Sequence, residues 1–302
     1  MKISVIGAGA LGKTYGGLLS FDHEVHYLVR NDFKAMQQNN SFTLHFSQKE
    51  QNLEIKAPLI HQSPQTLPPS DIVIISLKTT ENKMIESLLV NCLKPDSIIL
   101  IIQNGIGNEE WISQFSKECA IVCGISSMGA YREGPTLVEI PIIGELRLAP
   151  FNTSKACELM QSLFAKSPII INSKIFTSYR EIRWRKLLWN VPFSSLSIIY
   201  KQDSSSLASK SPYVTIVRAV MNEIVEIAHT QGVEITQNDV LKMLELTMGF
   251  KEYYPSMFRD YYEGKPIEKE YIIDNVLKIA KEQHINTPML NMIASHLERS
   301  QD

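Results

Sequence analysis

Six residues near the N-terminus have the types and spacing needed to bind a phosphate group through the backbone. The segment Gly7-Ala8-Gly9-Ala10-Leu11-Gly12 matches G-x-G-x-x-G, follows a strand-like run and begins a helical one. In that setting Gly7 permits a tight turn, Gly9 lets backbone N–H groups approach a pyrophosphate, and Gly12 lets the helix pack against the strand. The helix N-terminus adds oriented donors and partial positive charge. The motif therefore predicts a dinucleotide site, and a strand–helix turn without a ligand is the alternative.

The residues after the second strand-like run indicate which dinucleotide is bound. An acidic residue there would accept hydrogen bonds from a ribose hydroxyl and repel a phosphate. Arg30 occupies this position instead, and its planar guanidinium suits a phosphate. The sequence therefore favours NADP(H) over NAD(H), although Asp32 two positions later leaves NAD(H) open. The alternative for Arg30 is a solvated surface cation.

Two further polar segments follow strand-like runs. The carboxyl ends of parallel strands face the cofactor crevice in folds of this kind, so Lys78 is expected to contact the ribose or the phosphates, with a surface lysine as the alternative. The segment Gln103-Asn104-Gly105-Ile106-Gly107 places an amide side chain beside two glycines, which suits a loop that passes close to a ligand. Asn104 is thus a candidate to bind the cofactor or the substrate, or else a simple turn residue.

A stripe of polar residues in the second half is the other candidate site. Lys186, Asn190 and Ser194 are each four residues apart, so they share one face of a helix. Apolar and aromatic neighbours, including two tryptophans, flank the stripe. Because an unpaired buried ammonium is costly, Lys186 is expected to meet a partner or a ligand. The alternative is a lysine whose stem lies on apolar surface while its charge stays in solvent, and Pro192 is expected to kink the helix.

Acidic and hydroxyl side chains follow further along the chain. Ser256 and Asp260 can share one helix face, and Glu268 begins a helix whose first turns also carry Glu270 and Asp274. Acids at that place complement the helix dipole. The sharper hypothesis is that one of them faces the crevice and binds a substrate hydroxyl.

The elements that must position these residues change character along the chain. Val/Ile/Leu-rich runs separated by helices predict a parallel sheet covered on both faces, which is the doubly wound pattern. These runs lie at residues 2–6, 25–29, 71–77, 97–102 and 120–124. Residues 136–143 and 144–148 are expected to form a hairpin or meander, and 168–172 a last strand. The fold class predicted is an α/β Rossmann-type N-terminal domain with a parallel-sheet core, followed by an all-α C-terminal domain.

The second half is expected to be helical throughout. The pattern predicts helices over 178–200, 213–232, 236–250 and 267–284, and a terminal helix that begins near Pro288. The domain boundary is expected near residue 173, which gives an NADP-binding domain over 1–173 and a substrate domain over 174–302.

Composition limits the class of protein. The 302 residues carry 30 basic and 32 acidic side chains, and this balance argues against a protein that wraps nucleic acid. The four cysteines form no CxxC pair and have no histidine at ligand spacing, so no metal site is expected. No signal peptide or membrane span is evident. We therefore expect a soluble, cytoplasmic protein with reduced thiols.

With these residues in this order, the chain resembles the ketopantoate reductase family (2-dehydropantoate 2-reductases) over essentially its whole length. The matching residues are the glycine loop 7–12, Arg30, Lys78, the QNGIG loop that contains Asn104, Lys186 with Asn190, and Ser256 with Glu268. The combination is specific, although each piece alone is not.

The resemblance implies a reaction and a role for each residue. NADPH would deliver hydride to the ketone carbon of 2-dehydropantoate and give pantoate for pantothenate (coenzyme A precursor) biosynthesis. Lys186 would polarise the carbonyl and donate the proton, and Glu268 would bind the terminal hydroxyl of the substrate. Asn190 and Asn104 would orient the substrate and the lysine, and Ser256 would contact the substrate carboxylate.

One position departs from the family pattern. The family usually has a second asparagine four residues after Asn190, where this chain has Ser194, a substrate-binding candidate with a shorter reach. A reductase of the same fold acting on a different branched 2-keto acid is therefore the alternative. A third hypothesis is a non-enzymatic NADP-binding sensor, against which Lys186 and Glu268 argue. The expected partner is a small 2-keto acid, with no nucleic acid or membrane, and a helical second domain would permit a homodimer.

Overall fold

The computed structural model describes residues 1–299, which divide into two compact units. The first unit comprises Met1–Gln103 and Asn108–Tyr179. The second comprises Asn104–Gly107 and the chain from Arg180 onward. This division by contacts lies a few residues beyond the boundary proposed from the sequence at residue 173. It also assigns a short segment of the N-terminal half to the second unit.

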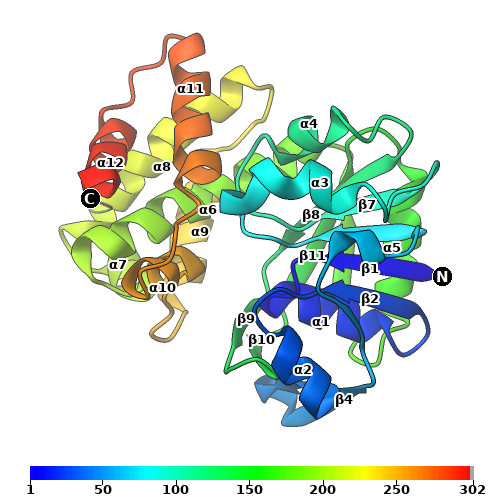
Figure 1. Ribbon diagram of the computed structural model, residues 1–302. Coiled ribbons are helices and arrows are strands. Elements are labelled where there is room, and N and C mark those ends of the chain that lie inside the picture. The colour runs from blue at the N-terminus through cyan, green and yellow to red at the C-terminus, as the bar shows by residue number, and fades with distance from the viewer. Residues whose placement is uncertain (300–302) are drawn as a thin grey trace. The chain divides into compact units, whose positions relative to one another are not determined.

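The first unit is built on an eight-stranded sheet (Figure 1). The strand order is β12-β11-β8-β7-β6-β1-β2-β5, and among the described strands of this sheet only the β8–β11 pair is antiparallel. The strands are β1 (Lys2–Ile6), β2 (Glu24–Leu28), β5 (Leu59–His61), β6 (Ile72–Ile75), β7 (Ile98–Ile101), β8 (Ala120–Ser126), β11 (Glu145–Pro150) and β12 (Asn172–Ile175). The predicted Rossmann-type α/β fold is confirmed.

Both faces of this sheet are buried, as the continuous apolar runs predict. In β6, Ile72 and Ile74 belong to one hydrophobic core, whereas Val73 and Ile75 belong to another on the opposite face. The first core includes side chains of α1 and α5, and the second includes side chains of α3 and α4. The helices are α1 (Ala10–Leu19), α2 (Phe33–Asn39), α3 (Ile85–Leu89), α4 (Asn108–Ser113) and α5 (Lys155–Ala165).

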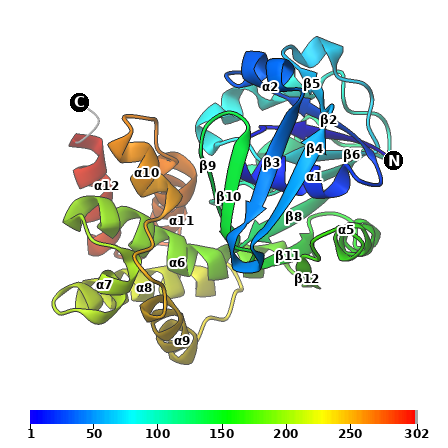
Figure 2. The same ribbon diagram turned by 90° about the horizontal axis from the view of Figure 1, so that it is seen from below.

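A second, four-stranded sheet of order β4-β3-β10-β9 lies against α1 (Figure 2). Its strands are β3 (Ser41–Phe46), β4 (Gln51–Lys56), β9 (Gly129–Arg132) and β10 (Leu137–Ile142). Both strands predicted over 136–148 exist, but their pairing as a hairpin or meander is wrong, because β10 pairs with β3 and β9 while β11 joins the large sheet. Gly144 lies between β10 and β11 at a φ of +64°. A Cβ added there would lie 2.4 Å from the Ser127 carbonyl oxygen, so the turn requires glycine. The last strand also begins later than predicted, at Asn172.

The second unit is helical, which confirms the predicted all-α region. Its helices are α6 (Tyr179–Tyr200), α7 (Ser204–Ser209), α8 (Tyr213–Thr230), α9 (Gln237–Met248), α10 (Ser256–Tyr262), the π-helix η4 (Glu270–Asp274), α11 (Asn275–Glu282) and α12 (Pro288–Arg299). One hydrophobic core joins α6, α8 and the later helices. Thr236 and Asp239 form a reciprocal capping box that begins α9. None of the helices within residues 1–299 combines the length and apolar character needed to cross a membrane.

Candidate functional site

The three glycines of the N-terminal loop occupy their positions for different geometrical reasons. Gly7 has a φ of +99°, and a Cβ there would lie 2.5 Å from the Leu77 nitrogen. A Cβ on Gly12 would lie 2.1 Å from the Gly7 carbonyl oxygen. Gly9, by contrast, has nothing within 4 Å of its Cβ position. Gly7 and Gly12 are thus required by close packing, whereas Gly9 leaves open space in front of the backbone.

This open side suits a pyrophosphate. Gly9 is the N-cap of α1 and provides no side-chain hydrogen bond to the first turn. The N–H groups of that turn therefore have no cap from Gly9, and they carry the partial positive charge of the helix end. The residues of the loop, Gly7, Ala8, Gly9, Ala10, Leu11 and Gly12, fit a dinucleotide phosphate in the way the motif requires. Ser76, which sequence reasoning missed, donates to the Gly7 carbonyl oxygen at 2.7 Å and fixes the turn.

The carboxyl end of β2 lies at the same edge of the sheet as the glycine loop, because β1 and β2 are parallel with Ile6 opposite Leu28. Arg30 is exposed there and donates to Glu81 at 3.1 Å. Glu81 belongs to the short helix η3 (Thr79–Met84), which begins directly after Lys78. Arg30 and Lys78 thus follow β2 and β6, the two strands that flank β1.

Asp32 is engaged by two cations that the sequence did not indicate. The Lys13 ammonium donates to the Asp32 carboxylate at 2.7 Å, and the Arg132 guanidinium donates to the same oxygen at 2.5 Å. Lys13 also donates to the Pro135 carbonyl oxygen at 2.6 Å. Burial lowers the pKa of Lys13, while its hydrogen bond to the Asp32 carboxylate opposes that change. No short motif predicts this contact, since Lys13 and Arg132 are far apart in the sequence.

The predicted polar stripe lies along α6 in the second unit. Asn190 and Ser194 are each only 4% exposed, and Lys186 is partly buried with its ammonium 5.2 Å from the Trp189 ring centroid. This is cation–π geometry. The helix continues through Pro192. The amide of Asn190 donates to the Asn104 side-chain oxygen at 3.3 Å, so two of the candidate residues contact each other.

The loop that carries Asn104 is fixed by the region around Glu268. Gly105, at a φ of +83°, approaches the Tyr271 carbonyl oxygen so closely that a Cβ would lie 2.3 Å from it. The Ile106 N–H donates to this same oxygen at 3.0 Å, and Asn275 donates to the Ile106 carbonyl at 2.8 Å. Tyr271 lies in η4 and Asn275 begins α11. Sequence reasoning missed both anchoring residues.

Glu268 and Ser256 occupy different surroundings. Glu268 is 2% exposed and lies just before η4, and its carbonyl oxygen accepts a hydrogen bond from the Ile272 N–H at 3.2 Å. A π-helical turn of this kind is frequent at functional sites. Ser256 is the exposed first residue of α10. Lys186, Asn190, Ser194, Ser256 and Glu268 all belong to the second unit, and the roles assigned to them stay predictions.

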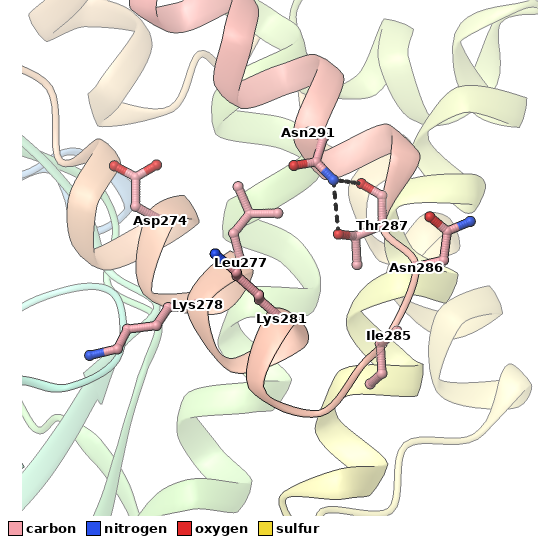
Figure 3. Close-up of a pocket in the computed structure, with 8 residues that line it drawn as sticks. All are labelled: Asp274, Leu277, Lys278, Lys281, Ile285, Asn286, Thr287 and Asn291. Atoms are coloured by element: carbon pink, nitrogen blue, oxygen red, sulfur yellow. Dashed lines mark hydrogen bonds between the residues drawn. The ribbon is translucent and has the colours of Figure 1, made fainter.

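A hollow of about 440 Å³ lies elsewhere in the second unit (Figure 3). It is lined by Asp274, Leu277, Lys278, Lys281, Ile285, Asn286, Thr287 and Asn291. The Asn291 amide donates to both oxygens of Thr287, at 2.8 and 3.2 Å. Asp274, one of the three acidic candidates with Glu268 and Glu270, lines this hollow, and none of the other candidate residues does. Within residues 1–299, no group of three or more His, Cys, Asp or Glu side chains is placed to hold a metal ion.

Comparison with known proteins decides the family. The family model described as ketopantoate reductase PanE/ApbA matches residues 3–153, and its C-terminal model matches residues 178–301. The chain belongs to the ketopantoate reductase family. It is 28% identical to the 2-dehydropantoate 2-reductase of Nostoc sp., over 98% of this chain and 94% of that protein.

Solved structures of this family have the same fold. The crystal structure of 2-dehydropantoate 2-reductase from Geobacter metallireducens GS-15 is 29% identical, with a TM-score of 0.93 over 99% of this chain and 100% of that one. D-mandelate dehydrogenase, solved with NADH and anilino(oxo)acetate, shares the fold alone at 22% identity and a TM-score of 0.88, over 100% of this chain and 98% of that one. The ketopantoate reductase family thus accounts for both halves of the chain.

Proposed function

We propose that the protein catalyses the NADPH-dependent reduction of 2-dehydropantoate to pantoate, a step of pantothenate biosynthesis. Both halves match the family, and relatives named 2-dehydropantoate 2-reductase align over nearly the whole chain. The observation that carries the proposal is the contact between Asn190 of α6 and Asn104. It joins the helix that carries Lys186 to the loop that packs against η4. The buried Glu268 lies two residues before the start of η4.

The cofactor fits the residues at the edge of the first unit's sheet. The glycine loop 7–12 would hold the pyrophosphate, Arg30 the 2′-phosphate, and Lys78 the ribose or phosphates. When bound, NADPH supplies the hydride that reduces the ketone carbon. The protein's own residues supply placement and the proton.

Lys186 is the residue proposed to act on the carbonyl oxygen. Its ammonium polarises the C=O bond and gives a proton to the oxygen as the carbon accepts hydride, so a hydroxyl group forms and a neutral amine remains. The Trp189 ring beside the ammonium limits its freedom. Asn190 and Asn104 orient the substrate, and Glu268 binds its terminal hydroxyl.

The remaining polar positions recognise the ends of the substrate. Ser256, exposed at the start of α10, is proposed to contact the carboxylate. Ser194 lies one helical turn after Asn190, on the same face of α6. Its shorter side chain leaves that part of the pocket with less reach than an asparagine would have.

A steady-state assay with NADPH and 2-dehydropantoate tests the proposal directly. We expect oxidation of NADPH that depends on the keto acid and a stoichiometric yield of pantoate. Absence of turnover at millimolar keto acid, with NADPH binding intact, would reject the reductase assignment. Tight NADPH binding without turnover on any 2-keto acid would support the sensor hypothesis instead.

Ser194 favours a second candidate, a reductase of another branched 2-keto acid. The buried serine replaces the asparagine usual in the family, and the fold is shared with a D-mandelate dehydrogenase. A panel of 2-keto acids distinguishes the two candidates. The second is preferred if kcat/KM is highest for an acid other than 2-dehydropantoate.

We further propose a cytoplasmic location and a homodimer. The first is supported by Cys92, Cys119, Cys123 and Cys157, all of which are buried free thiols. The second is supported by Leu241, Leu246 and Met248, large apolar side chains of α9 that are exposed. Sedimentation of the purified protein at several concentrations tests the homodimer.

A further inference from the structure

Asp32 lies two residues after Arg30 and would leave NAD(H) open, yet its charge is already engaged. Its carboxylate is 13% exposed, and one oxygen accepts hydrogen bonds from both Lys13 and Arg132. A carboxylate held by two cations presents less negative charge to a ribose hydroxyl than a free carboxylate does. It also repels a nearby phosphate less than a free carboxylate does.

Lys13 holds the Asp32 carboxylate in this ion pair from inside the protein. It directly follows Gly12 of the glycine loop, and its side chain is fully buried. Its ammonium has Asp32 and the Pro135 carbonyl oxygen as partners. A buried ammonium that lost its carboxylate would be strongly destabilising. Asp32 is therefore required by the fold as the counter-ion of Lys13.

Arg132 adds the charge that makes this edge positive. It lies at the end of β9 in the smaller sheet, and its side chain is 36% exposed. Arg30, two residues before Asp32, is more exposed still and pairs with Glu81. Lys13, Arg30 and Arg132 thus place three positive charges beside the carboxylates of Asp32 and Glu81.

We propose that Arg132 is a positioning residue for cofactor selection, which acts through Asp32 so that the end of β2 accepts a phosphomonoester on the adenosine ribose. This inference rests on the proposed use of NADP(H). Lys13 neutralises Asp32 from inside the protein and Arg132 from the solvent side. The 2′-phosphate then meets Arg30 with the charge of Asp32 already compensated.

Titration with two adenosine fragments, in the absence of any keto acid, tests the proposal. The fragments are 2′,5′-ADP and 5′-AMP, which differ only in the 2′-phosphate. In Arg132→Met we expect the dissociation constant of 2′,5′-ADP to rise about tenfold, because one charge-assisted contact to Asp32 is lost, while that of 5′-AMP changes by less than about threefold. Arg132→Lys, which keeps the charge, should retain the preference.

A control variant separates the effect of charge at this edge from a general loss of structure. Arg147→Met is the matched control, since Arg147 is 37% exposed and pairs with Glu145 on β11. It should change neither dissociation constant.

Three results would overturn the inference. They are equal weakening of both fragments in Arg132→Met, no weakening of either, and a wild-type protein that binds 5′-AMP as tightly as 2′,5′-ADP. Failure of the substrate proposal looks different, because it leaves fragment binding intact while turnover of the keto acid is absent.

Discussion

Replacing Gly9 by alanine should separate nucleotide binding from folding. Gly9 has φ and ψ of −76° and −163°, a conformation that alanine adopts without strain. Its Cβ would meet no protein atom within 4 Å. The added methyl group would instead occupy the space in front of the α1 N-terminus, where the pyrophosphate is expected.

The expected magnitudes follow from that geometry. Alanine is a poorer N-cap than glycine, but it restricts the unfolded chain by a similar free energy, so the free energy of unfolding should change by less than about 0.5 kcal/mol. The NADPH dissociation constant should rise at least tenfold, which corresponds to about 1.4 kcal/mol. Thermal unfolding without ligand measures the first quantity, and quenching of tryptophan fluorescence by NADPH measures the second.

Gly12→Ala is the matched comparison. Its Cβ would lie 2.1 Å from the Gly7 backbone oxygen and 2.5 Å from the Ser76 hydroxyl, so the loop must move. We expect the free energy of unfolding to fall by about 3 kcal/mol and Tm to fall by about 6–12 °C. If Gly9→Ala bound NADPH as tightly as the wild type, the backbone at Gly9 would not approach the pyrophosphate. If it unfolded as readily as Gly12→Ala, the geometrical distinction would be wrong.

Three other outcomes are expected. Lys186→Ala should lower kcat by about 10²- to 10⁴-fold while leaving the NADPH dissociation constant unchanged, and a kcat near the wild-type value would remove Lys186 from the chemistry. Ser194→Asn should raise kcat/KM for 2-dehydropantoate several-fold relative to other 2-keto acids, because the longer side chain adds about one hydrogen bond to the substrate. If the ratio of the kcat/KM values for these acids did not change, the role given to Ser194 would be contradicted. The hydrogen bond from Lys94 lowers the pKa of Asp71, so the stability this carboxylate contributes is complete above its ordinary pKa of 3.8 and is lost as the pH falls through the lowered value. Asp71→Asn should therefore be less stable than wild type in urea at neutral pH, and the difference should shrink in acid.

The sequence predicted the large sheet because its strands are read from local composition. Runs such as 72–75 are apolar at every position, and each position is buried on one face or the other. The smaller sheet was missed because its strands come from two distant parts of the chain. The pairing of β10 with β3, residue Leu137 opposite Thr43, leaves no local signal. The partners of Asp32 were missed for the same reason.

The helical unit shows the same division between local and distant information. The spacing of Lys186, Asn190 and Ser194 predicts a shared face of α6, and burial of Asn190 and Ser194 follows from the apolar residues around them. That Asn104 meets Asn190 depends instead on where a loop of the N-terminal half lies. The family resemblance implied that Asn104 and Asn190 belong to one substrate site, whereas the spacing of residues in the sequence could not show this.

Gly105 and Gly107, beside Asn104, are explained by where the loop packs and not by a ligand. Two glycines next to an amide suggested a close approach to a ligand, but Gly105 is required by the Tyr271 carbonyl oxygen, 2.3 Å from its Cβ position. Gly107, at a φ of +93°, has the Asn275 amide 3.1 Å from its own Cβ position. Both glycines therefore serve to seat the loop on η4 and α11. Asn104 is the polar residue of the loop whose side chain accepts a hydrogen bond from α6, and a role in binding is proposed for that amide.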